Sequence, residues 1–422
     1  MKRIIIAICI LCCFQSLLQA QDTSYVRKII KTLTAEEYFG RGYTKQGVQL
    51  AADFLEQEMK SIGLSPFQDN YKQDLSYVVN VFPSAYSLKL DDKTYQAGTE
   101  YIISPDCGNI NEKFELYKVP IQFLNDSSKF CKIKKKNTEG KFVVLHLHEI
   151  SDRKQKHFIR TKISDNFLKA RGYILVQDIY PIWSISATKN DAAIIRFNKS
   201  KFPESAKTIA LHIESEQKPV ETSNLIAYIP GETDKKTIVF TAHYDHLGGI
   251  GDSIFFPGAQ DNASGVATCL NIAKHYTENP VDYRVVIMLF TGEEAGLLGS
   301  TYYSLNPLFP LSEIDFLINL DMVGTGSDGI TIVNAKDSTY QDAFSKFKEI
   351  NIQDSLQLKI QARGISANSD HYPFNAQGVK GIFIYSRGGN TFYHNPQDTE
   401  RTVSLAAYHE IFTLITKFSD QL

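Results

Sequence analysis

The sequence predicts an α/β fold: a mostly parallel mixed sheet flanked by helices, with an inserted, mainly β domain. Apolar runs in the second half of the chain each stop just before a polar cluster, at residues 238–240, 284–290 and 316–320. Such runs are typical of strands buried on both faces of a parallel sheet. From about 84 to 220 the pattern changes to short β-like runs separated by turn residues. We therefore expect a discontinuous α/β domain over 21–83 and 221–422, with 84–220 inserted.

Two helices are expected ahead of the insert, over residues 24–33 and 47–62. Apolar residues in the second recur at helical spacing, namely Val48, Ala51, Ala52, Leu55 and Met59. Gly63 and Pro66 end this helix, because glycine closes helices and proline cannot continue them.

The insert contains short β-like runs at residues 101–103, 142–146, 170–176 and 193–197. A lysine cluster within 132–136 is expected to be a solvated loop, since blocks of like charge usually lie in solvent. His146, His148 and His157 could bind a metal ion. We interpret them as surface imidazoles, because no set of carboxylates accompanies them.

Regular α/β alternation begins near residue 222. We expect strands at 224–229, 237–242, 284–290, 316–320, 330–333 and 381–386, and helices at 262–276 and 405–418. A Pro-Gly turn at 230–231 separates the first two strands.

Composition and charge narrow the class of protein. The chain has 422 residues, 43% hydrophobic and 22% charged, as in a globular protein with a large core. A net charge of -2 favours neither nucleic acid nor an anionic membrane as a partner. Of the six cysteines, three lie in the first twenty residues, which leaves Cys107, Cys131 and Cys269. This odd number argues against a disulfide framework, while pairing of Cys107 with Cys131 stays open.

The first twenty residues have the pattern of a secretory signal peptide. Lys2 and Arg3 precede an apolar stretch at 4–14 that is too short to span a bilayer, and Ala20 is a small residue at a cleavage point. We expect removal of 1–20 and a secreted protein, periplasmic or extracellular. The alternative is an uncleaved anchor. No other stretch is long and apolar enough to span a membrane, so stable membrane insertion after cleavage is not expected.

Polar clusters that carry the candidate chemistry follow the expected strands. They contain His243, Asp261, Glu293 with Glu294, Asp321 and His394. In open α/β sheets, ligands bind beyond the carboxyl ends of the strands. We therefore expect the first four clusters to gather at one rim of the sheet. His394 lies in a glycine-rich and proline-containing loop, which suits a ligand delivered from across the cleft.

The residue types fit a two-metal hydrolase. Asp245, two residues after His243, can hold the second ring nitrogen of a ligating imidazole. Asp261 could be only a helix N-cap, but a carboxylate can also bridge two cations. Adjacent glutamates repel each other, so the pair at 293–294 fits one metal ligand and one general base better than two solvated acids.

The counted metal ligands are His243, Asp261, Glu294, Asp321 and His394. If Asp261 bridges, each of two ions receives a histidine, a terminal carboxylate and Asp261, and positions stay open for water. Histidine and carboxylate ligation without thiolate suits Zn²⁺, with Mn²⁺ or Co²⁺ as alternatives.

At this point the chain resembles the M28 family of zinc peptidases, the co-catalytic aminopeptidases. The resemblance is carried by TAHYDHLG, QDNASG, TGEEAGLLGS, NLDMVG, NSDHYPF and FYHNPQDT, in the family's order. It covers about 222–422 and, more weakly, 33–66. It implies a zinc-aminopeptidase or phosphorylase-like fold. Many members carry an inserted β-rich domain, often of the protease-associated type, and 84–220 occupies that position.

The resemblance also implies roles within the site. His243 and Asp321 would hold one zinc, Glu294 and His394 the other, and Asp261 both. Glu293 would be the general base and Asp245 the residue that orients His243. The implied activity is removal of N-terminal residues from peptides by a water activated between two Zn²⁺ per chain.

Substrate contacts are expected from Asp370, Tyr393 and Arg387. A single-zinc glutaminyl cyclase is the first alternative, although Tyr393 stands where such cyclases usually have tryptophan. A carboxypeptidase would need cations such as Arg363 for the substrate carboxylate. A non-catalytic receptor-like homologue would be expected to lack ligands or the base, and none is missing. The oligomeric state is not predicted.

Overall fold

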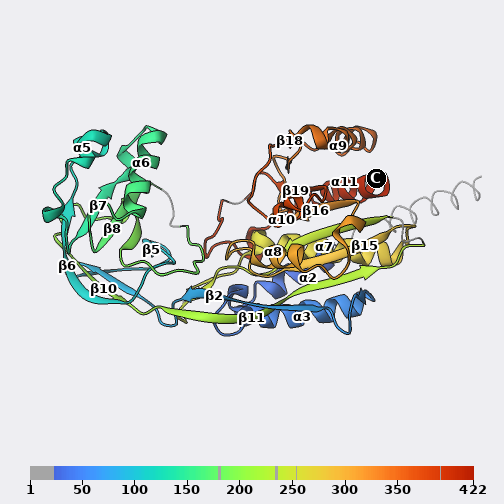
Figure 1. The fold of residues 1–422 in the computed structure, drawn as a ribbon, viewed down its shortest axis with the longest axis horizontal. Helices are drawn as coiled ribbons and strands as arrows, with labels where there is room; N and C mark the ends of the chain where they lie inside the picture. Colours follow the sequence, from blue (N-terminus) through green and yellow to red (C-terminus); the bar gives the residue numbers. More distant parts are fainter. Residues whose placement is uncertain (1–22, 179–181, 233–235, 253, 390) are drawn as a thin grey trace, which may run out of the picture.

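The computed structural model describes residues 23–178, 182–232, 236–252, 254–389 and 391–422, so the expected signal peptide lies outside the described residues. Two lobes follow one another along the long axis of the molecule (Figure 1). One is built on a nine-stranded sheet and the other on an eight-stranded sheet. Within the described part of the chain, no helix combines the length and the apolar character needed to cross a bilayer.

The nine-stranded sheet is mixed, and its centre is parallel. Its order is β1 (Ser65–Pro66), β11 (Glu216–Ile229), β15 (Arg284–Phe290), β12 (Thr237–His243), β16 (Phe316–Leu320), β19 (Gly381–Ser386), β17 (Ile330–Val333) and β18 (Ile360–Ala362), with β2 (Lys72–Val81) also paired to β11. β15, β12, β16 and β19 run parallel, whereas β11 is antiparallel to β15, and β17 is antiparallel to β19 but parallel to β18. The predicted fold class is confirmed.

Helices cover both faces of this sheet. They are α2 (Thr23–Leu33), α3 (Gly47–Ile62), α7 (Ser264–Glu278), α8 (Leu298–Leu305), α9 (Gln341–Gln353), α10 (His371–Ala376) and α11 (Tyr408–Asp420). Alternate residues of β15 point to opposite faces, as the period of a strand requires. Val285 and Ile287 belong to the core with α7, and Val286 and Met288 to the core with Tyr303 of α8. Burial on both faces explains why these strands are continuous apolar runs.

The second lobe has its own sheet and cores. Its strands are β3 (Ser87–Leu90), β4 (Lys93–Tyr95), β5 (Tyr101–Ile103), β6 (Ile110–Lys118), β7 (Phe142–His146), β8 (Gly172–Gln177), β9 (Ala193–Asn198) and β10 (Thr208–Ile213). β6, β7, β8 and β9 run parallel. Three helices that the sequence did not predict lie in this lobe: α4 (Ile121–Leu124), α5 (Ser127–Cys131) and α6 (Arg153–Ser164). Cys107 and Cys131 are both free thiols.

The two lobes are joined by the paired strands β2 and β11. Their antiparallel pairing extends from Lys72 opposite Leu225 to Val81 opposite Glu216, so the chain leaves and re-enters the first lobe at adjacent positions. Both strands run along the bottom of Figure 1 between the lobes. A hairpin of the first lobe, β13 (Gly248–Ile250) and β14 (Ile254–Phe256), packs into the core of the second, where Phe256 stacks on Trp183.

Candidate metal centre

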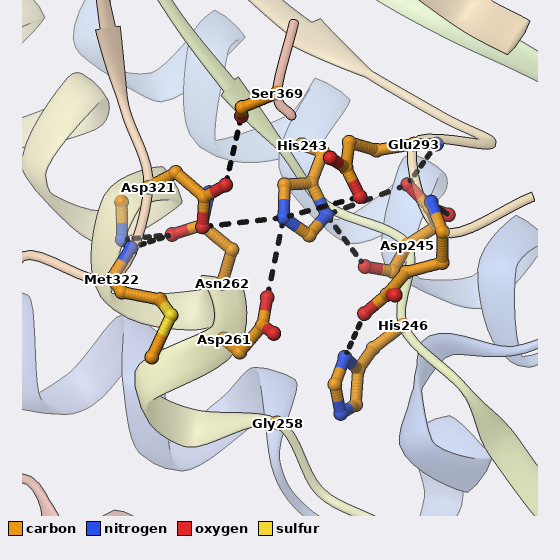
Figure 2. Close-up of polar contacts among 12 residues, drawn as sticks. His243, Asp245, His246, Gly258, Asp261, Asn262, Glu293, Asp321, Met322 and Ser369 are labelled. Carbon is orange, nitrogen blue, oxygen red and sulfur yellow. Dashed lines mark hydrogen bonds and ion pairs between the residues drawn. The ribbon is translucent and has the colours of Figure 1, made fainter. Parts of the chain in front are cut away.

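The carboxyl ends of the parallel strands bring His243, Asp261, Glu293 and Asp321 around one space (Figure 2). His243 is the last residue of β12, and Asp321 directly follows β16. The His243 Nε2 atom lies 3.3 Å from Asp261 Oδ1, 3.5 Å from Asp321 Oδ1 and 4.0 Å from Glu293 Oε2. The donor atoms of His243, Asp261 and Asp321 lie close enough together to share one cation.

A second set of donors meets on the other side of Asp261. His394 Nε2 lies 3.1 Å from Glu294 Oε2 and 3.2 Å from Asp261 Oδ2. One oxygen of Asp261 therefore faces His243, and the other faces His394. The structure thus brings together all five residues that the sequence marks as ligands, with Asp261 between the two histidines.

Both imidazoles are oriented by backbone carbonyl groups. His243 Nδ1 lies 3.1 Å from the Asp245 carbonyl oxygen, and His394 Nδ1 lies 2.8 Å from the Trp183 carbonyl oxygen. When Nδ1–H donates to a carbonyl oxygen, Nε2 is left without a proton, and its lone pair points into the site. Trp183 belongs to the second lobe, so that lobe helps to fix one ring of the centre.

The carboxylate of Asp245 lies beside His243 and also contacts the glutamate pair. Its Oδ1 is 3.7 Å from His243 Nδ1, while the carboxylate accepts hydrogen bonds from the backbone N–H groups of Glu293 (3.1 Å) and Glu294 (3.3 Å). Tyr43 donates its hydroxyl to the same carboxylate at 2.6 Å. Asp245 orients His243 through its backbone, and its side chain positions the glutamate pair.

Asp261 lies in a wide turn and is not a helix N-cap. Residues Ala259–Ala263 form one wide turn before α7, and Asp261 has non-helical dihedral angles. Gly258, at φ +62°, opens this turn, and a Cβ atom there would lie 2.2 Å from the Asp261 carbonyl oxygen. The fully buried Arg41 donates to the carbonyl oxygens of Gly258 and Asp261. Asp398 accepts from the Asp261 N–H group, so the backbone is held from both sides.

A chain of hydrogen bonds fixes Asp321. Ser369 donates to Asp321 Oδ2 at 2.8 Å and accepts from Asn319, which itself accepts from Thr241. Asp321 Oδ1 faces His243 and has no hydrogen-bond partner among the described residues, and the same holds for His394 Nε2. Buried polar atoms without hydrogen-bond partners are rare, and at such a cluster they fit the ligand atoms of a metal ion.

Burial and neighbouring charges shift the pKa values of Glu293 and Glu294 in opposite directions. Burial, with the charges of Glu294 and Asp321, raises the pKa of Glu293 well above its usual value, although His243 opposes the shift. Burial opposes ionisation of Glu294, but the nearby His394 lowers its pKa to about 2. The charges of Glu293 and Asp321 raise the pKa of His243 against the effect of its burial. Buried carboxylates outnumber the imidazoles here, and cations would balance them.

The predicted substrate residues occupy three different environments. Asp370 is fully buried, and burial raises its pKa to about 7. Tyr393 is 45% exposed and stacks on the His394 ring at 3.8 Å between centroids. Arg387 donates to the backbone carbonyls of Asp328 and Lys359. His371, which follows Asp370, is fully buried, and burial lowers its pKa to about 4.

Several supporting residues were missed by sequence reasoning. They are Arg41, Tyr43, Trp183, His246 and Asp398. His246 Nδ1 lies 2.7 Å from Glu294 Oε1, which leaves Glu294 Oε2 for the centre. The Gly-Arg-Gly sequence at 40–42 was one available signal, because an arginine between two glycines is placed for backbone contact. The other residues come from distant segments, and no spacing pattern connects them.

The fold and the site together define a buried imidazole and carboxylate centre at the carboxyl rim of an α/β sheet. Residues 224–419 of the chain match the family model of peptidase family M28.

Relatives in sequence carry peptidase names. The chain is 31% identical over 193 residues to aminopeptidase YwaD of Bacillus subtilis, a match that covers 42% of this chain and 39% of the relative. It is 29% identical over 210 residues to a probable leucine aminopeptidase of Arthroderma otae, covering 46% and 56%. The chain therefore spans about two fifths to little more than half of these relatives.

Solved structures share the fold over nearly the whole chain, including the second lobe. A zinc aminopeptidase from Bacillus subtilis superposes with a TM-score of 0.69 at 18% identity and 95% coverage of both chains. A peptidase M28 precursor from Shewanella amazonensis gives 0.72 at 17% identity, covering 96% of this chain and 94% of that chain. The two-lobed architecture is thus shared with these proteins.

Proposed function

We propose that this chain is a secreted, zinc-dependent aminopeptidase that holds two Zn²⁺ ions and removes N-terminal residues from peptides. The observation that carries the proposal is Asp261, which presents one oxygen to His243 and the other to His394. The match of residues 224–419 to the M28 family model and the aminopeptidase names of relatives support the chemistry, and a zinc aminopeptidase has the same fold. Secretion is supported by the leader-like pattern of residues 1–20.

Each residue of the centre has a distinct task in this proposal. One ion would be held by His243, Asp261 and Asp321, and the other by Asp261, Glu294 and His394. When bound, zinc supplies Lewis-acid chemistry that acidifies water and polarises a carbonyl.

Glu293 acts as the general base. It lies beside His243, outside the set of ligands, and its raised pKa favours uptake of a proton. Its carboxylate takes the proton of the attacking water and then returns it to the leaving amine. The acid-rich surroundings also favour a protonated N-terminal amine of the substrate, because opposite charges attract.

Residues 84–220 form, in this proposal, an inserted domain that shapes access to the centre and supplies no metal ligand. The pairing of β2 with β11 supports it, because the two ends of the insert lie side by side. A short Gly/Ser linker in place of 84–213 should preserve the fold of the first lobe. The Trp183 carbonyl would be lost, so retention of the ion at His394 should weaken, and retention at His243 should not.

The function is tested by a metal count together with a substrate panel. Purified protein is expected to contain two zinc ions and to release the first residue of peptides with a free amine. The same peptides with an acetylated N-terminus should not be cleaved. Equal cleavage of free and blocked peptides would indicate an endopeptidase. A stable single ion in fully active protein would overturn the two-metal site and favour a single-zinc enzyme.

A further inference from the structure

We propose that the cleft between the second lobe and His394 is a subsite for a carboxylate of the substrate, with Arg160 and Arg196 as its specificity residues. This inference rests on the proposed peptidase function and adds a substrate class to it. The carboxylate is either the C-terminus of a short peptide or an acidic side chain beyond the scissile bond.

Residues of both lobes line this cleft. Its volume is about 590 Å³, and Tyr393 and His394 of the metal centre form part of its wall. Arg160 of α6 and Arg196 of β9 line it from the second lobe. α6 lies on the side of that lobe that faces the first lobe (Figure 1). A cavity of this size is typical of small-molecule sites and accommodates a short peptide segment next to the catalytic centre.

The described lining of the cleft contains the side chains of two arginines but no acidic side chain. Across the described ranges, neither Arg160 nor Arg196 forms an ion pair with a carboxylate. Within the described ranges, Arg196 donates a hydrogen bond from Nη1 to the Ile182 carbonyl at 3.2 Å, and a guanidinium group has five N–H donors in total.

The positive charges of the Arg160 and Arg196 guanidinium groups also repel each other. Burial lowers the pKa of Arg196, the like charge of Arg160 lowers it further, and Asp106 offsets part of the effect. Two cations that share a half-enclosed cleft are stabilised by an anion between them. A guanidinium fork matches the two oxygens of a carboxylate, so a carboxylate is the anion that fits a peptidase substrate.

The charge pattern across His394 fits a substrate with two opposite ends. On one side lie the acids Asp261, Glu293 and Glu294 of the centre, which favour a protonated amine. On the other side lies the arginine cleft. A short peptide with a free amine and a free carboxylate presents this order of charges along its length.

The test compares kcat/KM for matched substrates in wild-type protein and in R160Q/R196Q. The first pair is a dipeptide and its C-terminal amide. The second pair is an amidated tripeptide with glutamate or glutamine as its second residue. In one or both pairs, we expect the kcat/KM of wild-type protein to be about 10- to 100-fold higher for the substrate that carries the carboxylate. Charge-assisted hydrogen bonds allow a difference of this size. The double variant should lose this preference mainly through KM. Arg153, an exposed residue at the start of α6, provides the matched control R153Q.

The pattern of results identifies the source of the carboxylate. Loss of preference confined to the first pair assigns the C-terminus, and loss confined to the second assigns the side chain. If wild-type protein cleaves both members of each pair equally, the subsite is wrong while the aminopeptidase function stands.

A binding measurement keeps the subsite testable without catalysis. If no free-amine peptide is cleaved, the proposed function fails, and calorimetry with glutarate then decides on the subsite. Weaker binding by R160Q/R196Q than by wild-type and R153Q supports it. Equal or undetectable binding by all three proteins overturns it.

Discussion

The molecule contains two sets of four parallel strands, and they end in very different surroundings. In the first lobe, β15, β12, β16 and β19 lead to buried imidazoles and carboxylates. In the second, β6, β7, β8 and β9 end in Lys118, His146, Gln177 and Asn198. Both rims have the strand geometry that favours ligand sites in α/β sheets. Parallel strand ends alone therefore do not make a ligand site. The residues that follow each strand determine whether one is present.

The two rims differ most in the solvent exposure of their acidic side chains. The second lobe has its own cluster, in which the ligand atoms of His146, His148 and Glu149 lie within 4.8 Å of one another. The acids near these histidines are open to solvent, with side chains 43% exposed in Glu149 and 70% in Glu204. In the first lobe the corresponding figure is 5% for both Asp261 and Glu294. Water can stabilise the exposed acids, whereas the buried ones require cations or protons.

The largest expected effect comes from replacing the carboxylate between the two histidines. Asp261→Asn keeps the shape of the side chain but removes its charge and one of its two acceptor oxygens. We expect the zinc content to fall for both ions and peptide hydrolysis to fall to background. Elemental analysis and a rate assay measure both. Asp354→Asn, an acid paired with Lys417 in the same lobe, is the control. Two ions retained by the Asp261 variant would show that it is not shared.

A smaller effect is expected at the general base. Glu293→Gln cannot accept a proton, so kcat should fall by roughly 10²–10⁴, the usual contribution of general acid–base catalysis. Zinc content should not change, because Glu293 is not counted among the ligands. The neighbouring Glu294→Gln is the comparison, since it should lose metal as well as activity. Wild-type turnover in Glu293→Gln would reject its role as the base.

Sequence reasoning was most accurate where burial dominates. The strands at 284–290, 316–320, 330–333 and 381–386 and the helix at 47–62 have the predicted bounds. Each is an apolar run or an apolar stripe closed by a turn residue, so local sequence and tertiary packing agree. The strands around the centre were predictable for the same reason, and with them the positions of His243 and Asp321 at strand ends.

Elements whose stability depends on distant contacts were missed. α6 is rich in lysine and arginine, and only three of its twelve residues are buried: Gln155, Ile159 and Ile163. β2 alternates weakly and is defined by its pairing with β11, more than 130 positions later in the chain. The predicted helix at 262–276 begins only at Ser264, because the Asn262 side chain accepts hydrogen bonds from the N–H groups of Gly265 and Met322.

The supporting residues of the centre follow the same logic. Trp183 reaches His394 from 211 positions away, and Tyr43 reaches Asp245 from 202 positions away. A backbone carbonyl that orients an imidazole leaves no mark on residue type. The sequence therefore identified the ligands, whose chemistry is specific, but not the groups that hold them.

A moderate effect is expected when one of these supports is removed. Tyr43→Phe deletes the hydroxyl that donates to Asp245 at 2.6 Å and keeps the ring. Asp245 also holds the backbone of the glutamate pair, so zinc affinity should fall about 10-fold, the lower end of effects seen for groups behind metal ligands. Competition with a chelator measures this affinity. Tyr228→Phe, whose ring packs on Phe67, is the control. Unchanged zinc affinity in Tyr43→Phe would mean that Asp245 needs no hydroxyl partner.

The smallest effect is expected at the rim of the second lobe. The His146 and His148 rings lie 5.4 Å apart, and burial lowers the pKa of His146, which favours the neutral imidazole that can bind a metal ion. What differs is the exposure of the acids beside them, which solvent already stabilises. The double variant H146A/H148A should therefore keep the zinc content and kcat/KM of the wild-type protein. Loss of part of its packing should lower the free energy of unfolding by about 1 kcal/mol. A zinc ion that disappears with these two histidines, while hydrolysis persists, would show that an exposed rim can hold metal as firmly as a buried one. In that case burial would no longer explain the difference between the two lobes.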